Sequence, residues 1–405
     1  MWNFFTSGTA QWKWNRLIYN FFKQSNNGGK RLIMKKGKIF FLIFMIIWLV
    51  LIILNFVIPE PAFSEQENRY LAKVPEFSFE DLVSGKYSEE LDTYINDHFV
   101  FRNFWLKLNS FVQVAIGKTE NNGVYIGKDG YLFEKFEYTD KERENISIAT
   151  NAINNFAVKT GIPTYFLLAP NSIYINQDKL PDNVNAVEQN EIINEVYSAC
   201  PDVKTIDTVE TLKENKSTTK LYFKTDHHMT SEGAYLLYQE FCKAANIPPA
   251  QLSEFNKETV TTNFLGTFDS KAQVAWQEPD EITVYKNAIN TNVLGDYDGE
   301  TYNSIFNDDY LTKKDKYSYF LNGNHAKVVI KTKVNNGKKL LVVKDSYSHI
   351  MAQFLCQNYE EIHFLDPRYY NLPLSDYCSQ NEIDETLFLY NVSNLVSDVG
   401  IRNVR

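Results

Sequence analysis

One long apolar segment stands near the start of the chain, at residues 39–58, and only Asn55 interrupts it. A helix crosses the hydrocarbon of a membrane with roughly 20 apolar residues at 1.5 Å each, so this segment is long enough to span one. Pro59 and Pro61 follow directly, and proline ends a helix because it lacks an amide hydrogen and clashes with the preceding turn. The pattern predicts a single membrane-spanning helix.

The charges on the two sides of this segment predict its orientation. Basic residues precede it at Lys30, Arg31, Lys35, Lys36 and Lys38, and acidic residues follow it at Glu60, Glu65 and Glu67. Because basic flanks stay on the cytoplasmic side, residues 1–38 are expected to be cytoplasmic and everything after Pro59 to be exported. A cleaved signal peptide is the alternative, but the apolar run is too long for one and no small-residue cleavage site follows it.

The residues before Met34 are rich in aromatic side chains. They suit a short segment at the lipid interface, where aromatic side chains are enriched. They equally suit an upstream extension of a protein that starts at Met34 rather than Met1.

Residues 59–116 are expected to combine a linker with amphipathic helices. The stretch 60–83 is polar and contains proline, as a linker leaving the bilayer would be. The apolar positions between Leu91 and Val112 recur at helical spacing. They predict one or two helices that pack on the main domain.

Residues 117–405 alternate between strand-like and helix-like runs. The predicted strands are 130–133, 163–168, 203–206, 221–223, 325–331, 340–343, 362–365 and 386–390. The predicted helices are 144–159, 188–199, 231–245, 348–358 and 374–380. This alternation predicts an α/β domain with a mostly parallel sheet covered by helices on both faces. Residues 250–320 lack the alternation and are expected to be an insertion of loops and short strands over the sheet.

Composition and cysteine spacing narrow the classes of function. The net charge of −9 gives no basic footprint for a nucleic-acid partner. The four cysteines, Cys200, Cys242, Cys356 and Cys378, are scattered and form no C-x-x-C pair. This argues against a structural zinc site and against a disulfide framework, although a Cys356–Cys378 pair stays open. No metal or cofactor is expected.

Two segments that follow predicted strands carry candidate chemistry: Asp226-His227-His228, and Asp345-Ser346-Tyr347-Ser348. Reactive groups in a parallel sheet collect beyond the carboxyl ends of its strands. A serine at a strand-to-helix turn is exposed and lies near backbone amides that can bind an oxyanion. Asp226 and His228, two apart in an extended segment, point the same way. Asp226 can then hold Nδ1 of His228 while Nε2 faces Ser346, as a serine nucleophile requires.

Each segment also has a structural explanation. Asp226, Thr230 and Ser231 suit the entry to the following helix, because such side chains cap helix N-termini. Asp-Ser after a strand is common for the same reason. The occurrence of both segments in one exported α/β domain favours a Ser-His-Asp site.

A series of motifs resembles the DHHW family of bacterial membrane-anchored proteins, relatives of the alginate O-acetylation proteins within the SGNH hydrolase-like group. The series runs through SEQENRYLAKVPEF, YINDHFVFRNFW, GKDGYLF, APNSIYINQDKLP, KTDHHMTSEGAY, EPDEITVY, VVKDSYSHIMAQFL, DPRYYNLPL and LFLYNVSNL. The resemblance implies a three-layer α/β/α domain in which the aspartate and histidine precede the serine. It makes Ser346 the nucleophile, His228 the general base and Asp226 its orienting partner.

The resemblance also implies supporting residues around this site. The backbone amide of Ser346 and the side chain of Asn391 are candidate oxyanion donors, and Arg368 is a candidate substrate contact. Tyr347 and His227 are two further candidates for substrate binding or for the oxyanion hole. The chain departs from the family pattern at Met229, where the DHHW signature ends in tryptophan, and at Lys344, where glycine is usual before Asp-Ser. Lys344 leaves the glycine-dependent part of the oxyanion geometry open.

The function implied is O-acyl transfer, with acetyl as the expected group, to a cell-wall or extracellular polysaccharide. A multi-pass O-acyltransferase in the same membrane is the implied acyl donor. Two alternatives keep the fold: an esterase with the same three residues, and a non-catalytic glycan-binding or scaffold protein of an export complex. Metal-dependent phosphoester cleavage also uses Asp-His-His, but it needs a further D-x-D pair upstream at a strand end, which this sequence lacks.

Overall fold

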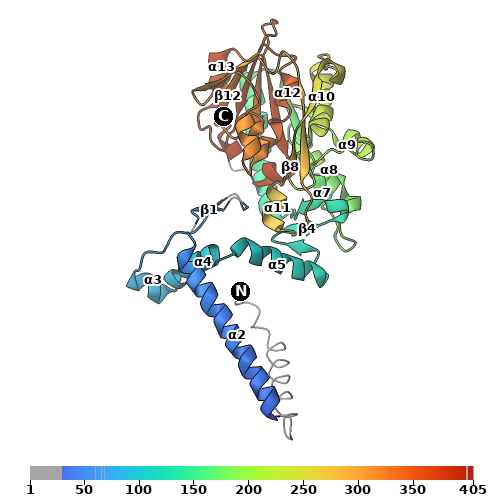
Figure 1. The fold of residues 1–405 in the computed structure, drawn as a ribbon. Helices are drawn as coiled ribbons and strands as arrows, with labels where there is room; N and C mark the ends of the chain where they lie inside the picture. The colour runs from blue at the N-terminus through green and yellow to red at the C-terminus, as the bar shows by residue number, and fades with distance from the viewer. Residues whose placement is uncertain (1–29, 60, 65, 68, 398–399, 405) are drawn as a thin grey trace. The chain divides into compact units, whose positions relative to one another are not determined.

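The computed structural model describes residues 30–59, 61–64, 66–67, 69–397 and 400–404 (Figure 1). Helix α2 spans Lys30–Val57. Its stretch Gly37–Val57 is long and apolar enough to cross a membrane, as the sequence predicted. The aromatic-rich segment before residue 30 lies outside the described residues.

The chain divides into two compact units, residues 1–63 with 70–102 and residues 64–69 with 103–405. The first unit contains α2 with two short helices, α3 (Phe79–Ser84) and α4 (Lys86–His98). Ser78 caps α3 by accepting a hydrogen bond from the Asp81 amide, and Gly85 ends it in a left-handed conformation. Strands β1 (Phe63–Ser64) and β2 (Arg69–Tyr70) lie where the chain passes between the units.

The second unit is built on an eight-stranded sheet of order β11-β10-β12-β14-β13-β15-β6-β7. The strands are β6 (Thr164–Ala169), β7 (Lys204–Ile206), β10 (Leu294–Tyr297), β11 (Glu300–Tyr302), β12 (Lys327–Lys331), β13 (Lys339–Lys344), β14 (Glu361–Leu365) and β15 (Glu385–Asn391). The five strands from β14 to β7 are parallel neighbours, whereas β12, β10 and β11 extend the sheet antiparallel. The predicted α/β domain with a mostly parallel sheet is therefore confirmed.

Burial on both faces explains why the central strands read as continuous apolar runs. Every residue of β6 and β15 is buried, as is β13 after its first residue. The helices around them are α6 (Asp140–Thr160), α7 (Ser172–Ile175), α8 (Gln189–Ser198), α9 (Val209–Asn215), α10 (Ser231–Ala245), α12 (Ala352–Leu355), α13 (Leu374–Asn381) and α14 (Val392–Ser397). The predicted helix 231–245 is confirmed to the residue, and Thr230 caps it by accepting from the Gly233 amide.

The other α-helices and strands of this part of the chain lie outside the eight-stranded sheet. They are α5 (Arg102–Ala115), α11 (Thr267–Ala272), a small sheet of β3 (Glu120–Asn121), β4 (Val124–Ile126) and β5 (Leu132–Glu134), and a pair of β8 (Asn256–Phe264) with β9 (Asp280–Lys286). Residues 250–320 therefore do more than cover the sheet, because β10 and β11 join its edge. All four cysteines are buried free thiols, so Cys356 and Cys378 are not paired.

Two element predictions near the candidate chemistry are wrong. Residues 221–223 form no strand of the sheet, because their backbone pairs with the segment that follows: the Phe223 amide donates to the His228 carbonyl at 3.2 Å, and the Leu221 carbonyl accepts from the Thr230 amide at 3.0 Å. Only an isolated bridge joins Tyr222 to Met229. The predicted helix 348–358 is reduced to a 3-10 turn, Ser346–Ser348, and the one-turn helix α12.

The core offers a direct test of this packing. Phe388 in β15 is fully buried and makes edge-to-face contacts with Phe156 and Phe166, at ring centroid distances of 5.4 and 6.4 Å. We expect Phe388→Ala to lower the free energy of unfolding by about 3–5 kcal/mol, because the cavity adds to the lost burial. Val158→Ala, at an exposed position of α6, should change it by less than about 0.5 kcal/mol. Urea denaturation measures both.

Candidate active site

A closed loop holds Asp226 and His228 in fixed positions. The bridge between Tyr222 and Met229 closes it, and the Phe223 amide donates to the His228 carbonyl at 3.2 Å. Met229, which stands at the tryptophan position of the DHHW signature, is buried in the core. Met229 therefore packs beneath the loop. The side chains of Asp226 and His228 lie on the loop above it and bond to Thr267 and Ser346.

Ser346 lies directly beyond the carboxyl end of β13, in the first residue of the 3-10 turn. The preceding residue, Asp345, caps this turn by accepting from the Tyr347 amide at 2.8 Å. Ser346 retains a small exposed fraction of 9%, so its hydroxyl lies at the edge of the core. Ser346 follows β13 as predicted, but the predicted exposure of its side chain is wrong, because the turn is packed into the core.

Asp226, His228 and Ser346 form one continuous chain of hydrogen bonds. His228 Nδ1 lies 2.6 Å from Asp226 Oδ1, and His228 Nε2 lies 2.8 Å from Ser346 Oγ. The two contacts use opposite nitrogens of the same imidazole. With Nδ1 protonated toward the carboxylate, Nε2 is the acceptor for the serine proton, as general-base catalysis requires.

Asp226 is the most heavily bonded group of this chain. Its Oδ2 accepts from the amide of Thr267 at 2.8 Å and from the hydroxyl of Thr267 at 3.1 Å, while the His228 amide donates to Oδ1 at 3.0 Å. Burial raises the pKa of the Asp226 carboxyl, but the charges of His227 and His228 and these hydrogen bonds outweigh it and hold the pKa well below its usual range. The carboxylate therefore stays ionised.

Gly266 makes room for this carboxylate. A Cβ at Gly266 would overlap the Cβ and Oδ2 of Asp226 far inside van der Waals contact. Glycine is thus required here for the close approach of its backbone, and Thr267 follows it as the donor to Asp226. Sequence reasoning missed both residues, because they belong to the stretch 250–320 and carry no motif of their own.

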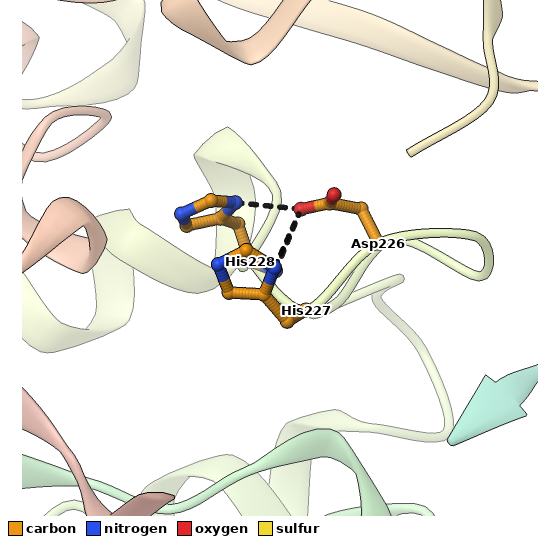
Figure 2. Close-up of side chains that lie close together, drawn as sticks. All are labelled: Asp226, His227 and His228. Carbon is orange, nitrogen blue, oxygen red and sulfur yellow. Dashed lines mark hydrogen bonds and ion pairs between the residues drawn. The ribbon is translucent and has the colours of Figure 1, made fainter. Parts of the chain in front are cut away.

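His227 shares the Asp226 carboxylate from the other side. Figure 2 shows the two imidazoles directed at the same carboxylate oxygen, with His227 Nδ1 at 3.7 Å. His227 Nδ1 also lies 2.7 Å from Thr267 Oγ1. Burial and the neighbouring His228 lower the pKa of His227 to about 4, so it is neutral at pH 7. Together, Asp226, His227 and His228 have donor atoms within 4.8 Å of one another and could hold a metal ion.

Two tyrosines enclose His228 and the serine. The ring of Tyr317 stacks on the His228 imidazole with centroids 3.5 Å apart and planes at 8°, and its hydroxyl donates to the Ser346 carbonyl at 3.1 Å. The Tyr347 hydroxyl donates to the His227 carbonyl at 2.6 Å. Burial raises the pKa of both tyrosines well above the usual value, so both remain neutral. Tyr317 is a third residue of the site, after Gly266 and Thr267, that sequence reasoning did not select.

The Asp345 carboxylate fixes the serine turn to the neighbouring strand. It is fully buried, and its Oδ2 accepts from the amide and side chain of Asn391 and from the side chain of Asn394, each at 2.9 Å. Asn391 was a candidate oxyanion donor, but in this geometry its side-chain amide donates to Asp345. Asn391 therefore contacts Asp345, which caps the turn of Ser346, and this contact occupies the amide that was predicted to bind the oxyanion.

Lys344 lies on the other side of Ser346 in a buried polar group. Its Nζ lies 2.7 Å from His349 Nε2 and 3.5 Å from Asp366 Oδ2. Arg368, a candidate substrate contact, donates to both oxygens of Asp366, at 2.8 Å from Nε and 2.5 Å from Nη2. Burial lowers the pKa of Lys344 to about 8, and Asp366 opposes this effect. The lysine in place of glycine thus enters an internal ion pair beside the serine.

A groove of about 880 Å³ opens beside His227 within the second unit. Its lining mixes charged, amide and aromatic side chains, among them Glu134, Phe136, Lys271 and Asn394. Asn394 also holds Asp345, and His227 is in contact with Asp226. The groove therefore lies next to both segments that carry the candidate chemistry.

Comparisons with known proteins agree with this architecture. The family model described as DHHW protein matches residues 115–365, more than half of the chain. A DHHW family protein from Eubacterium siraeum superposes with a TM-score of 0.62 at 25% identity, over 70% of this chain and 96% of that one. Bacillus cereus PatB1, in a structure with a sulfonyl adduct, gives a TM-score of 0.59 at 22% identity, over 70% and 98% of the two chains.

The other comparisons add less. The O-acetyltransferase domain of Pseudomonas putida AlgJ reaches a TM-score of 0.45 at 14% identity, over 68% and 93% of the chains, which is too weak to carry an argument. A search of curated proteins found no match. The family model and the Eubacterium siraeum structure agree with each other and with the order of the sequence motifs, and the chain belongs to the DHHW family of proteins.

Proposed function

We propose that this protein is a membrane-anchored, extracytoplasmic O-acyltransferase that moves an acyl group, with acetyl as the proposed group, onto a hydroxyl of a cell-wall or extracellular polysaccharide. One observation carries the proposal: the continuous contact from Asp226 through His228 to Ser346 Oγ, with both distances below 3 Å. This arrangement suits a serine nucleophile with a positioned base.

The proposed reaction has two halves. Ser346 Oγ attacks the acyl carbonyl of the donor while His228 Nε2 accepts the serine proton, and His228 then returns that proton to the leaving group. A sugar hydroxyl next attacks the acyl-serine while His228 accepts its proton, and His228 then gives that proton to Ser346 Oγ, which leaves as the new ester forms. Asp226 stabilises the imidazolium in each half, and the amide of Ser346 is the proposed donor to the oxyanion.

The N-terminal helix gives this chemistry its proposed location. Basic residues before α2 and acidic residues after it favour a cytoplasmic N-terminus and an exported second unit. A multi-pass acyltransferase in the same membrane is the proposed donor. Tethering in one membrane raises the effective concentration of two partners without a tight interface between them.

The groove beside His227 is the proposed place for the polysaccharide acceptor. Its volume and its mixture of polar and aromatic side chains suit sugar rings, which present hydroxyl groups and apolar faces together.

An esterase would use the same three residues with water in place of the sugar. Deletion of the gene should lower the acyl content of the surface polymer, and a rise on deletion would favour the esterase.

A serine-directed fluorophosphonate tests whether Ser346 is reactive. The PatB1 structure holds a sulfonyl adduct, which supports the use of such electrophiles on this fold. We expect the wild-type chain to be labelled and Ser346→Ala to be unlabelled. Ser348→Ala is the matched control, since Ser348 lies in the same turn but its hydroxyl donates to the Asp345 carbonyl. Folded wild-type protein that takes up no label would favour a non-catalytic binding or scaffold protein.

Asp226→Asn tests the role of the carboxylate. The amide keeps the shape but loses the charge that stabilises the imidazolium, and in a Ser-His-Asp hydrolase the same change costs about 10⁴ in kcat. We expect a loss of that order in acyl transfer to a soluble sugar acceptor. Asp269→Asn, at a buried aspartate of α11 that pairs with Lys314, should leave the rate nearly unchanged. Loss of wild-type activity on exhaustive chelation would instead favour a metal-dependent reaction.

The lowered pKa of Lys344 predicts how stability depends on pH. An unfolded lysine binds its proton up to about pH 10.5, whereas folded Lys344 releases it near pH 8. Between these values the unfolded state binds more protons, so this residue's contribution to stability rises with pH. Relative to Lys344→Met, the wild type should gain up to roughly 3 kcal/mol from pH 8 to pH 10.5.

Denaturant unfolding of both proteins across this pH range measures the difference. Lys331→Met is the control, because Lys331 is exposed and pairs with Glu361 at the surface. Its difference from the wild type should stay flat over the same range. A flat difference for Lys344→Met as well would show that folding does not lower the pKa of Lys344.

A further inference from the structure

Helix α5 presents an apolar face to solvent. Its exposed side carries Phe104, Leu108, Phe111 and Val112, and Ile116 follows directly after its last residue. Each of these five side chains is 41–78% exposed. The spacing of four, three, one and four residues places them on one side of a helix. Monomeric proteins rarely leave such a continuous apolar stripe uncovered, so the stripe indicates a binding surface.

The opposite face of α5 packs on other residues of the second unit, to which α5 belongs from Asn103 on. Ser110 is fully buried, lies roughly 200° around the helix from Leu108, and donates to the Ala272 carbonyl at 3.3 Å. Trp276, which is half exposed, contacts the ring of Phe111 edge to face at 5.9 Å and widens the apolar surface. The stripe is therefore held outward by packing on the other side.

The charge of this segment selects the kind of partner. No acidic residue occurs from Arg102 to Lys118, whereas Lys107 and Lys118 are exposed cations beside the stripe. An apolar face flanked by lysines and an indole is the composition of helices that lie in the plane of a membrane with anionic lipids.

Contacts within the first unit fix the segment that leads into α5, residues 96–102, beside the last turn of α2. The Val100 amide donates to Asn55 Oδ1 at 2.9 Å, and Asn55 lies in the last turn of α2. Arg102, the first residue of α5, pairs with Asp97 at 3.5 Å and donates to the Asn96 carbonyl at 3.0 Å. The turn between α4 and α5 is thus fixed two residues from a contact with α2.

We propose that α5 binds the outer surface of the lipid bilayer in which α2 is anchored. The side chains of its exposed stripe enter the acyl boundary, and Lys107 and Lys118 contact anionic head groups. This inference rests on the membrane anchoring in the proposed function. It adds a second attachment that holds the catalytic unit at the membrane surface, where a membrane-bound acyl donor would meet it.

The test uses the full-length chain in lipid nanodiscs that contain phosphatidylcholine and phosphatidylglycerol, one copy per disc. A nitroxide is attached to a single introduced cysteine, which is selective because the four native thiols are buried. Leu108→Cys and Phe111→Cys test the stripe, and Asn103→Cys and Ser217→Cys are exposed control positions, Asn103 on the side of α5 away from the stripe. Collision with oxygen reports lipid, and collision with a nickel chelate reports water.

We expect oxygen to collide with the labels at 108 and 111 more than the nickel chelate does, and the reverse at 103 and 217. Removal of phosphatidylglycerol should reduce this preference at 108 and 111. Equal access of the chelate to all four positions would overturn the proposal. So would protection from both reagents, which indicates a protein surface, or protection that appears only with two copies per disc, which indicates self-association.

Two further measurements separate this proposal from the proposed function. Flotation with vesicles tests anchoring by α2, and a chain that does not float overturns both the anchor and the lipid contact of α5. Fluorophosphonate labelling of Ser346 reports the candidate active site in the same sample. An anchored, labelled chain whose stripe stays in water would contradict the lipid contact alone.

Discussion

The buried carboxylate of Asp226 is the group on which the candidate site depends. It is bonded to His228 through two atoms, to Thr267 through two more, and lies beside His227. A buried charge of this kind is costly unless donors surround it, and here the donors come from two separate segments of the chain. The loop at 226–228 and the start of α11 therefore hold each other in place. The hydrogen bond from His228 Nδ1 to the Asp226 carboxylate fixes the orientation of the His228 ring.

A second buried carboxylate, Asp345, fixes the position of the turn that contains Ser346. It ties the turn after β13 to Asn391 at the end of β15 and to Asn394 in α14. The two carboxylates have different surroundings. Burial raises the pKa of Asp345 despite its amide donors, whereas the neighbouring imidazoles hold that of Asp226 low. Only the carboxylate beside histidine is suited to stabilise a developing imidazolium.

The parts that could be predicted from sequence are those whose cause is local. Apolar runs gave the central strands and α10, and spacing along the chain grouped Asp226 with His228. The loss of a strand at 221–223 could not be predicted, because the backbone of this segment pairs with residues 228–230 instead of with a strand of the sheet. The 3-10 turn at Ser346 is capped by Asp345, whose other partners, Asn391 and Asn394, lie more than 40 residues further along the chain. Tyr317, Gly266 and Thr267 could not be predicted either, because their contacts with the site are entirely tertiary.

Position 344 departs from the family pattern, while His228 still lies within 3 Å of both Asp226 and Ser346. The Lys344 side chain extends to His349 and Asp366. His349 is also buried, and its ring faces Tyr317, whose ring stacks on His228. Tyr317 thus contacts the imidazoles of both His228 and His349, and burial keeps its hydroxyl neutral. The ion pair between Lys344 and Asp366 is buried, so breaking it would first affect the stability of the end of β13.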